Sequence, residues 1–345
     1  MRITARFLAI CGMLFGHTQA AETNLPHVQF EHKDWEIACD NTRTCRAAGY
    51  QTEEIGASAS VMLTRAAGPN QAVTAEVQLA QSEDDNKLPG MLQMFVGKQA
   101  LGAIRLDREK RLGTLSAAQT AALLAALTKN TVIEWRAGKA SWTISNMGAN
   151  AVLLKMDEFQ GRIGTPQALV RKGDKPETSV LPALPRPVVH SVKPKDGTKE
   201  ITFTAGERAA LLAALRQSDK PNDCEKLHQG APDLNAYPLS SQTMLVSTTC
   251  WMGAYNTGEG YWITNRRAPY APRFVTDEAN EYHDGGLAAF QKGRGIADCI
   301  SYKTWTWDGK DFILTSVSTT GMCRQFAPGG AWDFPTLVSE VRPAR

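Results

Sequence analysis

Residues 297–318, ADCISYKTWTWDGKDFILTSVS, contain the strongest local signal for secondary structure in this chain. Two runs rich in β-branched and aromatic residues flank the dipeptide Asp308-Gly309. Such runs favour strands, and a glycine at this position accepts the positive φ that a type I′ turn needs. The stretch therefore predicts an antiparallel hairpin, with Cys299 near the start of its first strand and Cys323 just beyond its second.

Strand patterns continue towards the N-terminus from this hairpin. Short runs with alternating or β-branched side chains recur along the 345 residues, separated by polar turns. In the C-terminal half they fall at residues 242–252, 260–265 and 271–276, and in the N-terminal half at 33–39, 45–50, 58–66, 72–80, 92–97, 102–107, 131–136 and 140–145. The chain is therefore expected to consist mainly of sheet.

A repeated heptapeptide predicts two of the helices. AALLAAL occurs at residues 121–127 and again at 209–215, and each copy follows a capping-box pattern, S-x-x-Q from Ser116 and T-x-x-E from Thr204. The sequences around the two copies differ. This favours one helix type used in two different cores; duplication of a whole domain, which would show a sustained period, is the alternative.

A third helix is expected between Asn146, its predicted N-cap, and Gly161, its predicted C′ residue. Its apolar stripe consists of Ala149, Val152, Leu153, Met156 and Phe159. Strands followed by helices within one unit indicate the α+β class. We therefore expect two domains, each a mainly antiparallel sheet with one or two short packed helices.

The segment LPALPRPVVHSVKPK, residues 181–195, divides the chain. Its prolines favour an extended, semi-rigid connection. We expect an N-terminal α+β domain at 21–180, a proline-rich linker at 181–195 and a C-terminal β-rich domain at 196–345. The alternative is a proline-rich edge segment that lies against one domain.

The first residues resemble a secretory signal peptide. Arg2 and Arg6 precede a short apolar run, and Thr18-Gln19-Ala20 resembles a cleavage site. The run is much shorter than the roughly 20 apolar residues that span a bilayer. We expect residues 1–20 to be removed near Ala20, and the exported chain to have no membrane span.

Cleavage at that site would remove Cys11 and leave an even number of cysteines, which in an exported protein favours disulfides. Proximity in the sequence favours three pairs, and no cysteine or histidine spacing suggests a zinc site. The favoured pairs are Cys39–Cys45, Cys224–Cys250 and Cys299–Cys323.

The net charge gives no electrostatic case for a nucleic-acid partner or an anionic membrane surface, since it is only +3 before cleavage. Recognisable nucleophile, zinc-protease or phosphate-loop motifs do not occur in the sequence. The chain therefore predicts no cofactor and favours a protein that is not an enzyme.

Two loops carry candidate binding residues. The run CWMGAYNTGEGYW offers an aromatic surface for a peptide, sugar or protein, and the loop TDEANEYHDGG offers ligands for a divalent cation. The alternatives are aromatic side chains packed in the core and a solvated acidic loop. The aromatic candidates are Trp251, Tyr255, Tyr261 and Trp262; the metal candidates are Asp277, Glu278, Glu281, His283 and Asp284.

Four segments together resemble the exported bacterial proteins grouped as the domain of unknown function 1176 family. They are WEIACDNTRTC, SNMGANAVLLKMDEFQGRIGTPQALVRKG, CWMGAYN and the closing D-C, W-D-G and C positions. The first two are also similar to the invasion-associated locus B family. The resemblance implies six paired cysteines and a periplasmic location, and it implies no activity.

Together these features predict an exported, disulfide-stabilised periplasmic protein. We expect a non-enzymatic binding or envelope-maintenance role with a protein or cell-wall partner. A hydrolase acting on envelope material is the alternative, and it would need a cleft with a Ser-His or carboxylate pair.

Overall fold

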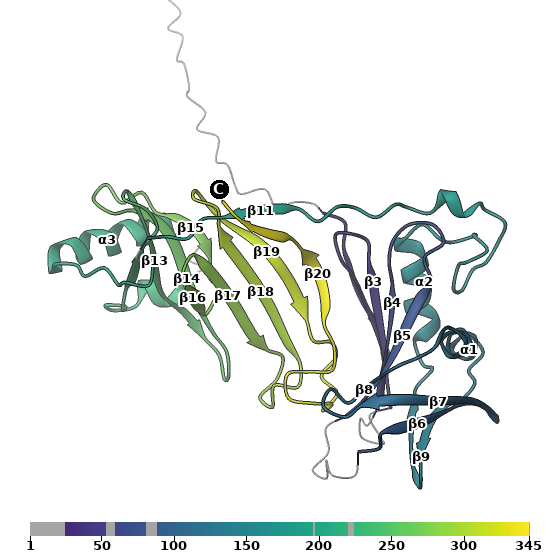
Figure 1. Cartoon of the computed structure of the whole chain (residues 1–345). Helices are drawn as coiled ribbons and strands as arrows, with labels where there is room; N and C mark the ends of the chain where they lie inside the picture. The colour runs from purple at the N-terminus through teal and green to yellow at the C-terminus, as the bar shows by residue number, and fades with distance from the viewer. Residues whose placement is uncertain (1–24, 53–58, 81–87, 196, 220–223, 345) are drawn as a thin grey trace, which may run out of the picture.

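The computed structural model describes residues 25–52, 59–80, 88–195, 197–219 and 224–344 (Figure 1). The predicted signal peptide at residues 1–20 lies outside the described residues. Antiparallel sheets dominate, with three short α-helices packed against them. The α+β class is confirmed.

The N-terminal half is built on one ten-stranded antiparallel sheet in the order β1-β2-β3-β4-β5-β8-β7-β6-β9-β10. Its strands are β1 (Val28–His32), β2 (Trp35–Cys39), β3 (Cys45–Tyr50), β4 (Ala59–Arg65), β5 (Val73–Leu79), β6 (Met91–Val96), β7 (Gln99–Asp107), β8 (Leu112–Thr114), β9 (Ile133–Ala137) and β10 (Ala140–Ile144). Neighbours in sequence pair antiparallel along β1 to β5.

Both faces of β2, β3 and β4 are covered, and alternation sends successive side chains to opposite faces. On one face Trp35, Ile37 and Leu63 pack with α1 (Ala117–Leu127) and α2 (Ala149–Phe159) in the main core. On the other face Ala48, Tyr50 and Met62 meet Phe326 and Phe334 from the C-terminal half. The two halves therefore share a core on this second face.

The C-terminal half contains two antiparallel sheets. The first has β12 (Asn235–Pro238), β13 (Thr243–Met252), β14 (Thr257–Asn265) and β15 (Arg273–Thr276). The second has β16 (Glu281–His283), β17 (Gly286–Lys292), β18 (Ile300–Trp307), β19 (Phe312–Thr319) and β20 (Phe334–Val338). One cluster joins the two sheets, and another joins the first sheet to α3 (Ala205–Ser218).

The repeated heptapeptide forms helices in two different cores, as predicted. Leu123 and Leu127 of α1 pack in the N-terminal core, whereas Leu211 and Leu215 of α3 pack against the first C-terminal sheet. Both predicted capping boxes are present.

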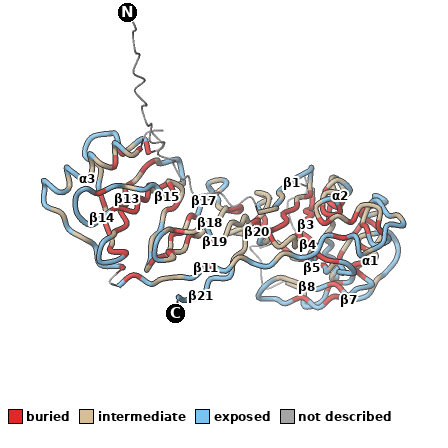
Figure 2. Tube along the Cα trace, turned by 90° about the horizontal axis from the view of Figure 1, so that it is seen from above, coloured by how far each residue is buried: buried red, intermediate tan, exposed pale blue. Residues whose placement is uncertain are grey.

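Part of the proline-rich segment forms a strand. β11 (Val188–Ser191) pairs in parallel with β21 (Glu340–Pro343). The N–H of Leu184 donates to Thr42 O, and the N–H of Val192 donates to Trp307 O, so the segment contacts both halves. Figure 2 shows it running alongside the molecule between the two halves. The domain boundaries at 21–180, 181–195 and 196–345 stay a prediction.

The hairpin of residues 297–318 is confirmed, but its predicted turn type is wrong. β18 and β19 pair from Trp307 and Phe312 outward. The positive φ belongs to Gly309 (+100°) alone, and the Asp308 carboxylate accepts from the amides of Lys310 and Asp311. A type I′ turn needs positive φ at both central residues, so the turn is not of that type.

The predicted N-cap of α2 is also wrong, whereas its apolar stripe and its C′ glycine are confirmed. Gly148 is the N-cap, with φ +98°, and the Asn146 side chain donates instead to Thr131 O at 2.7 Å. A side chain at residue 148 would collide with the His32 carbonyl. Close packing of α2 on the β1–β2 turn, rather than local capping, decides this helix start.

The three disulfides join Cys39 to Cys45, Cys224 to Cys250 and Cys299 to Cys323, the pairs that proximity favours. The first links paired positions of β2 and β3. All six cysteines are buried or partly buried.

Intact mass spectrometry of the exported protein tests both processing and pairing. We expect a mature chain that begins near Ala21 and takes up no thiol label before reduction, because Cys11 is removed and the other cysteines are paired. Reduction in denaturant should then expose six labelled sites. Label on the native protein, or a mass that includes residues 1–20, would contradict this.

Candidate functional site

The four candidate aromatic side chains do not form one surface. Tyr261 and Trp262 are 1% and 0% exposed, because adjacent residues of β14 point to opposite faces and both faces are covered. Placing them on a binding surface is therefore wrong. Trp251 is partly buried and its Nε1 donates to Asp277 O at 3.0 Å; Tyr255 is 46% exposed.

The acidic loop does not bring its five candidate ligands together. Glu278 forms an ion pair with Lys303 at 2.5 Å, and Asp284 forms one with Lys193 at 2.8 Å. Glu281 and His283 lie at the two ends of the short strand β16. Within the described residues, the one group of side chains close enough to share an ion is Asp298, Cys299 and Cys323, whose cysteines are bonded to each other.

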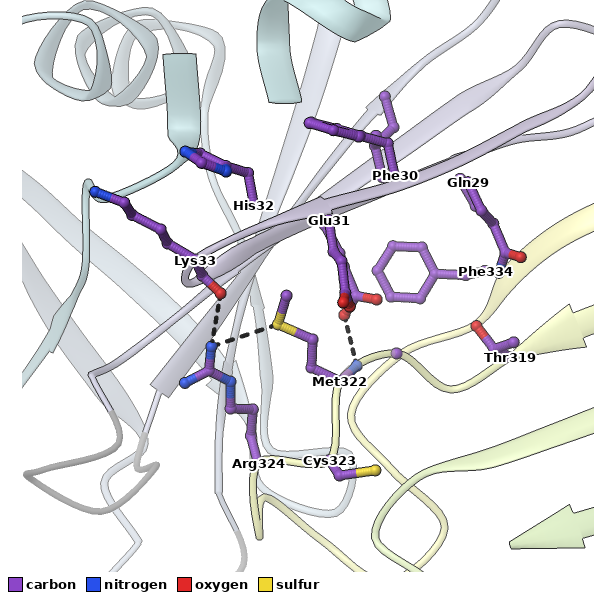
Figure 3. Close-up of a pocket in the computed structure, with 14 residues that line it drawn as sticks. Gln29, Phe30, Glu31, His32, Lys33, Thr319, Met322, Cys323, Arg324 and Phe334 are labelled. Atoms are coloured by element: carbon purple, nitrogen blue, oxygen red, sulfur yellow. Dashed lines mark hydrogen bonds between the residues drawn. The ribbon is translucent and has the colours of Figure 1, made fainter. Parts of the chain in front are cut away.

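A different site lies where the two halves meet. A cleft of about 900 Å³ separates β1 and the start of β2 from a C-terminal segment at residues 319–324. Figure 3 shows Gln29 and Glu31 directed from β1 towards Phe334 and Met322. The lining residues are Gln29, Phe30, Glu31, His32, Lys33, Glu36, Ile37, Ala38, Thr319, Gly321, Met322, Cys323, Arg324 and Phe334.

Glu36 lies at the centre of this junction. Its Oε1 accepts a hydrogen bond from the Tyr50 hydroxyl at 2.5 Å and another from the backbone N–H of Met322 at 2.7 Å. One carboxylate thus links β2 and β3 to a segment 286 residues away. Gly321 permits the approach with φ +87°, because a Cβ there would lie 2.5 Å from both Glu36 Oε1 and the Tyr50 hydroxyl.

Burial raises the pKa of Glu36, and the neighbouring Glu31 carboxylate raises it further, against the two hydrogen bonds and Arg324, which lower it. Glu31 and Glu36 are cross-strand partners in the β1–β2 register and so share one face. Burial also raises the pKa of Tyr50 well above its usual value, with the Glu36 carboxylate as the next cause.

The guanidinium of Arg324, from the C-terminal half, forms hydrogen bonds with the N-terminal half. It donates to Lys33 O at 2.9 Å and to Asp34 Oδ1 at 3.1 Å, and it lies 5.8 Å from the centre of the Tyr50 ring. In Figure 3 the side chains of His32 and Lys33 point away from Phe334. The cleft is therefore lined by two carboxylates, Glu31 and Glu36, and by the cations Lys33 and Arg324, of which Arg324 is paired with Asp34.

The sequence does not indicate this cleft, because alternation in WEIAC places Glu36 on the face opposite Trp35 and Ile37, which is the solvent side of a strand covered on one face only. One signal was available: CRAAGY and SVMLTR contain consecutive apolar residues, such as Val61, Met62 and Leu63, where strict alternation would interpose polar ones, and this is typical of strands covered on both faces. The residues that complete the cleft come from the far end of the chain, and no local pattern identifies them.

The titration of Glu36 predicts a pH-dependent effect of Glu36→Gln on stability. A carboxyl group whose pKa is raised on folding stabilises the protein below its unfolded pKa, near 4.5, and loses that contribution as the pH rises through its folded pKa. Glutamine keeps an acceptor for Tyr50 and Met322 without ionising. The stability of the variant relative to wild type should therefore be higher at pH 7 than at pH 4.

Urea unfolding followed by tryptophan fluorescence at both pH values measures this difference. Asp157 also has a raised pKa through burial, so the comparison is made between the variant and wild type at each pH. Equal differences at pH 4 and pH 7 would contradict a raised pKa for Glu36.

Comparison with known proteins covers both halves and the cleft between them. Residues 29–339 match the family model described as a protein of unknown function, DUF1176. The chain belongs to the DUF1176 family. The match includes Gln29, at one rim of the cleft, and the segment 319–324 at the other. In this member of the DUF1176 family, therefore, the residues that build the cleft all lie inside the matched region.

A curated relative of this DUF1176 chain is the uncharacterized protein YpfG of Escherichia coli strain K12. The two are 27% identical over 329 residues, which cover 88% of this chain and 90% of the relative. No solved structure matches the chain significantly. The similarity of the N-terminal half to the invasion-associated locus B family is not shown by these comparisons and stays a prediction.

None of the helices formed by the described residues has the length and hydrophobicity needed to cross a membrane. The three disulfides are compatible with an exported member of the DUF1176 family.

Proposed function

We propose that the protein is an exported periplasmic binding protein and that its ligand occupies the cleft between the two halves. The signal-like residues 1–20 and three disulfides support export. The single observation that carries the binding role is the cleft itself: about 900 Å³, lined by an exposed Glu31 beside a partly buried Glu36.

The cleft has the features of a binding site. It combines carboxylates with the ring of Phe334 and the flexible thioether of Met322. Its lining comes from residues 29–38 and from residues 319–324 near the other end of the chain, and hydrogen bonds of Glu36 and Arg324 join the two segments. A preorganised site of this kind loses little entropy when a ligand binds. The neighbouring carboxylates of Glu31 and Glu36 favour a ligand with a cationic group, since Arg324 is already paired with Asp34.

Photo-crosslinking in cells tests this placement. A crosslinking amino acid is introduced at Gln29 on the rim of the cleft, at Tyr255 on the exposed aromatic loop, or at Lys139 on the β9–β10 turn as a remote control. We expect a discrete adduct from Gln29 and none from Lys139. An adduct from Tyr255 alone would move the site to the aromatic loop and overturn the proposal.

One observation favours the second candidate, a hydrolase acting on envelope material. Glu31 and Glu36 are paired carboxylates in a cleft, and burial holds the pKa of Glu36 above its usual value, as a general acid requires. Purified protein would then release soluble products from isolated peptidoglycan, and Glu36→Gln would abolish the release. Binding without release favours the non-enzymatic role.

A further inference from the structure

The edge of β1 is the feature of the cleft that the proposed function leaves unused. β1 is the first strand of the ten-stranded sheet, and it pairs with β2 on one side. Four of its five residues are exposed. Among the described residues, the backbone hydrogen bonds of residues 28–32 are those of the β1–β2 ladder. Its outer edge is therefore available for another strand.

The edge lacks three devices that block strand addition, although it is five residues long and carries the charged Glu31. Proline, lysine and bulges commonly protect exposed edges. The sequence of β1, VQFEH, contains neither residue, and its register with β2 is unbroken over all five pairs. Glu31 is its one acidic side chain, and that side chain faces the cleft. A negative charge there rejects acidic strands and accepts basic ones.

The outward backbone groups and the cleft-facing side chains belong to the same residues. His32 and Trp35 flank the two-residue turn Lys33–Asp34, which makes them the closing hydrogen-bonded pair of the hairpin. Alternation then directs the N–H and C=O groups of Gln29 and Glu31 away from β2. A strand added there would place alternate side chains over the cleft.

We propose that the ligand is an extended polypeptide that adds as a strand to the free edge of β1 and places a lysine or arginine against Glu31 and Glu36. This inference rests on the proposed function and names its ligand class. Neighbouring strands lie about 4.8 Å apart, so a long basic side chain on the added strand reaches Glu31 directly and Glu36 one strand further. Backbone hydrogen bonds supply affinity, and the carboxylates of Glu31 and Glu36 supply specificity.

Fluorescence anisotropy with defined peptides tests the side-chain part of the proposal. The probe is a labelled, end-blocked peptide of nine residues, alternating threonine and valine around a central arginine, and the protein is the full mature chain with its disulfides intact. We expect central glutamate in place of arginine to weaken binding at least about tenfold. The double variant Glu31→Gln, Glu36→Gln should lose most of this preference.

Backbone methylation of the same peptide tests strand addition. A strand presents alternate N–H groups to opposite edges, so methylating one alternate set removes the bonds to β1 and methylating the other does not. The two methylated peptides should differ in affinity by about tenfold or more, as expected for several lost hydrogen bonds. On the protein, Gln29→Pro removes one outward N–H, and Gln29→Ala is its matched control; the proline variant should bind about fivefold more weakly.

Equal affinity of the two methylated peptides, no binding at millimolar peptide, or a concentration-dependent dimer that Gln29→Pro dissolves would each overturn the inference. The last result would mean that a second copy of the chain occupies the edge. Crosslinking from Gln29 separates these failures from failure of the proposed function. An adduct from Gln29 together with equal affinity of the methylated peptides rejects strand addition alone, whereas absence of any adduct from Gln29 rejects the cleft.

Discussion

Replacement of Arg162 by methionine is expected to lower the free energy of unfolding by about 3–5 kcal/mol, the cost of removing one member of a buried ionic network. The Arg162 side chain is 0% exposed. Its Nε donates to Gln160 Oε1 at 2.8 Å, and its Nη2 donates to the carbonyl oxygens of Ala66 and Gly68 at 3.2 and 2.7 Å. Methionine fills the space and leaves these acceptors without their donor.

The same network holds two further segments. Asp157 Oδ2 accepts from the amides of Leu169 and Val170, and Gln160 donates to the carbonyl oxygens of Arg43 and Arg65. Gln160 and Arg162 therefore fasten the end of α2 to the β2–β3 turn, to the end of β4 and to the residues after it, and Asp157 fastens α2 to the chain that follows. This region is one of the segments that carries the family resemblance, and its buried polar residues have a structural role.

Thermal and urea unfolding measure the effect. Arg171→Met is the matched control, since Arg171 is exposed in the same segment, and it should stay within about 0.5 kcal/mol of wild type. Arg162→Lys keeps a charge but not the planar donor geometry, and it should be intermediate. If Arg162→Met were as stable as Arg171→Met, the network would not be structural.

Gly321→Ala is expected to destabilise the protein by about 2–4 kcal/mol and to impair ligand binding in the cleft. About 1 kcal/mol comes from a side chain at φ +87°, and the rest from displacing the hydrogen bonds that join Glu36, Tyr50 and Met322. The added Cβ would lie 2.5 Å from the atoms of that junction.

Gly329→Ala separates the two causes. Gly329 has nearly the same φ, +85°, but an added Cβ would meet no atom within 4 Å. It should lose about 1 kcal/mol and keep its binding. Unfolding midpoints and the yield of the crosslink from Gln29 provide the two readouts. Equal loss in both variants would show that backbone strain alone acts at residue 321.

Local signals predicted much of the fold. The strands, the hairpin around Gly309 and the two capping boxes follow from side-chain period and turn chemistry, and these act within a few residues. Local signals do not predict the start of α2. The His32 carbonyl, more than a hundred residues earlier in the chain, leaves no room for a side chain at residue 148, so glycine is required there. The hairpin turn differs from the predicted type I′ turn, and in it the Asp308 carboxylate accepts hydrogen bonds from the amides of Lys310 and Asp311.

Local sequence patterns predict less of the candidate site than of the fold. Tyr261 and Trp262 lie in an aromatic run that offers a binding surface in the sequence, yet sheets and a helix from elsewhere cover both faces of β14. Glu36 is covered by a segment that lies 286 residues away in the sequence, so no local pattern indicates its burial. Which face of a strand is buried depends on such distant contacts, and one sequence read locally does not contain them.

The most direct test of the cleft as the ligand site is the crosslink from Gln29 measured in the double variant Glu31→Gln, Glu36→Gln. Both substitutions keep hydrogen-bonding side chains and remove the two carboxylates that would hold a cationic group. We expect the yield of the Gln29 adduct to be at least about tenfold lower in the double variant than in the wild-type cleft, while the protein stays folded and its disulfides stay intact. An adduct of unchanged yield in the double variant would contradict it.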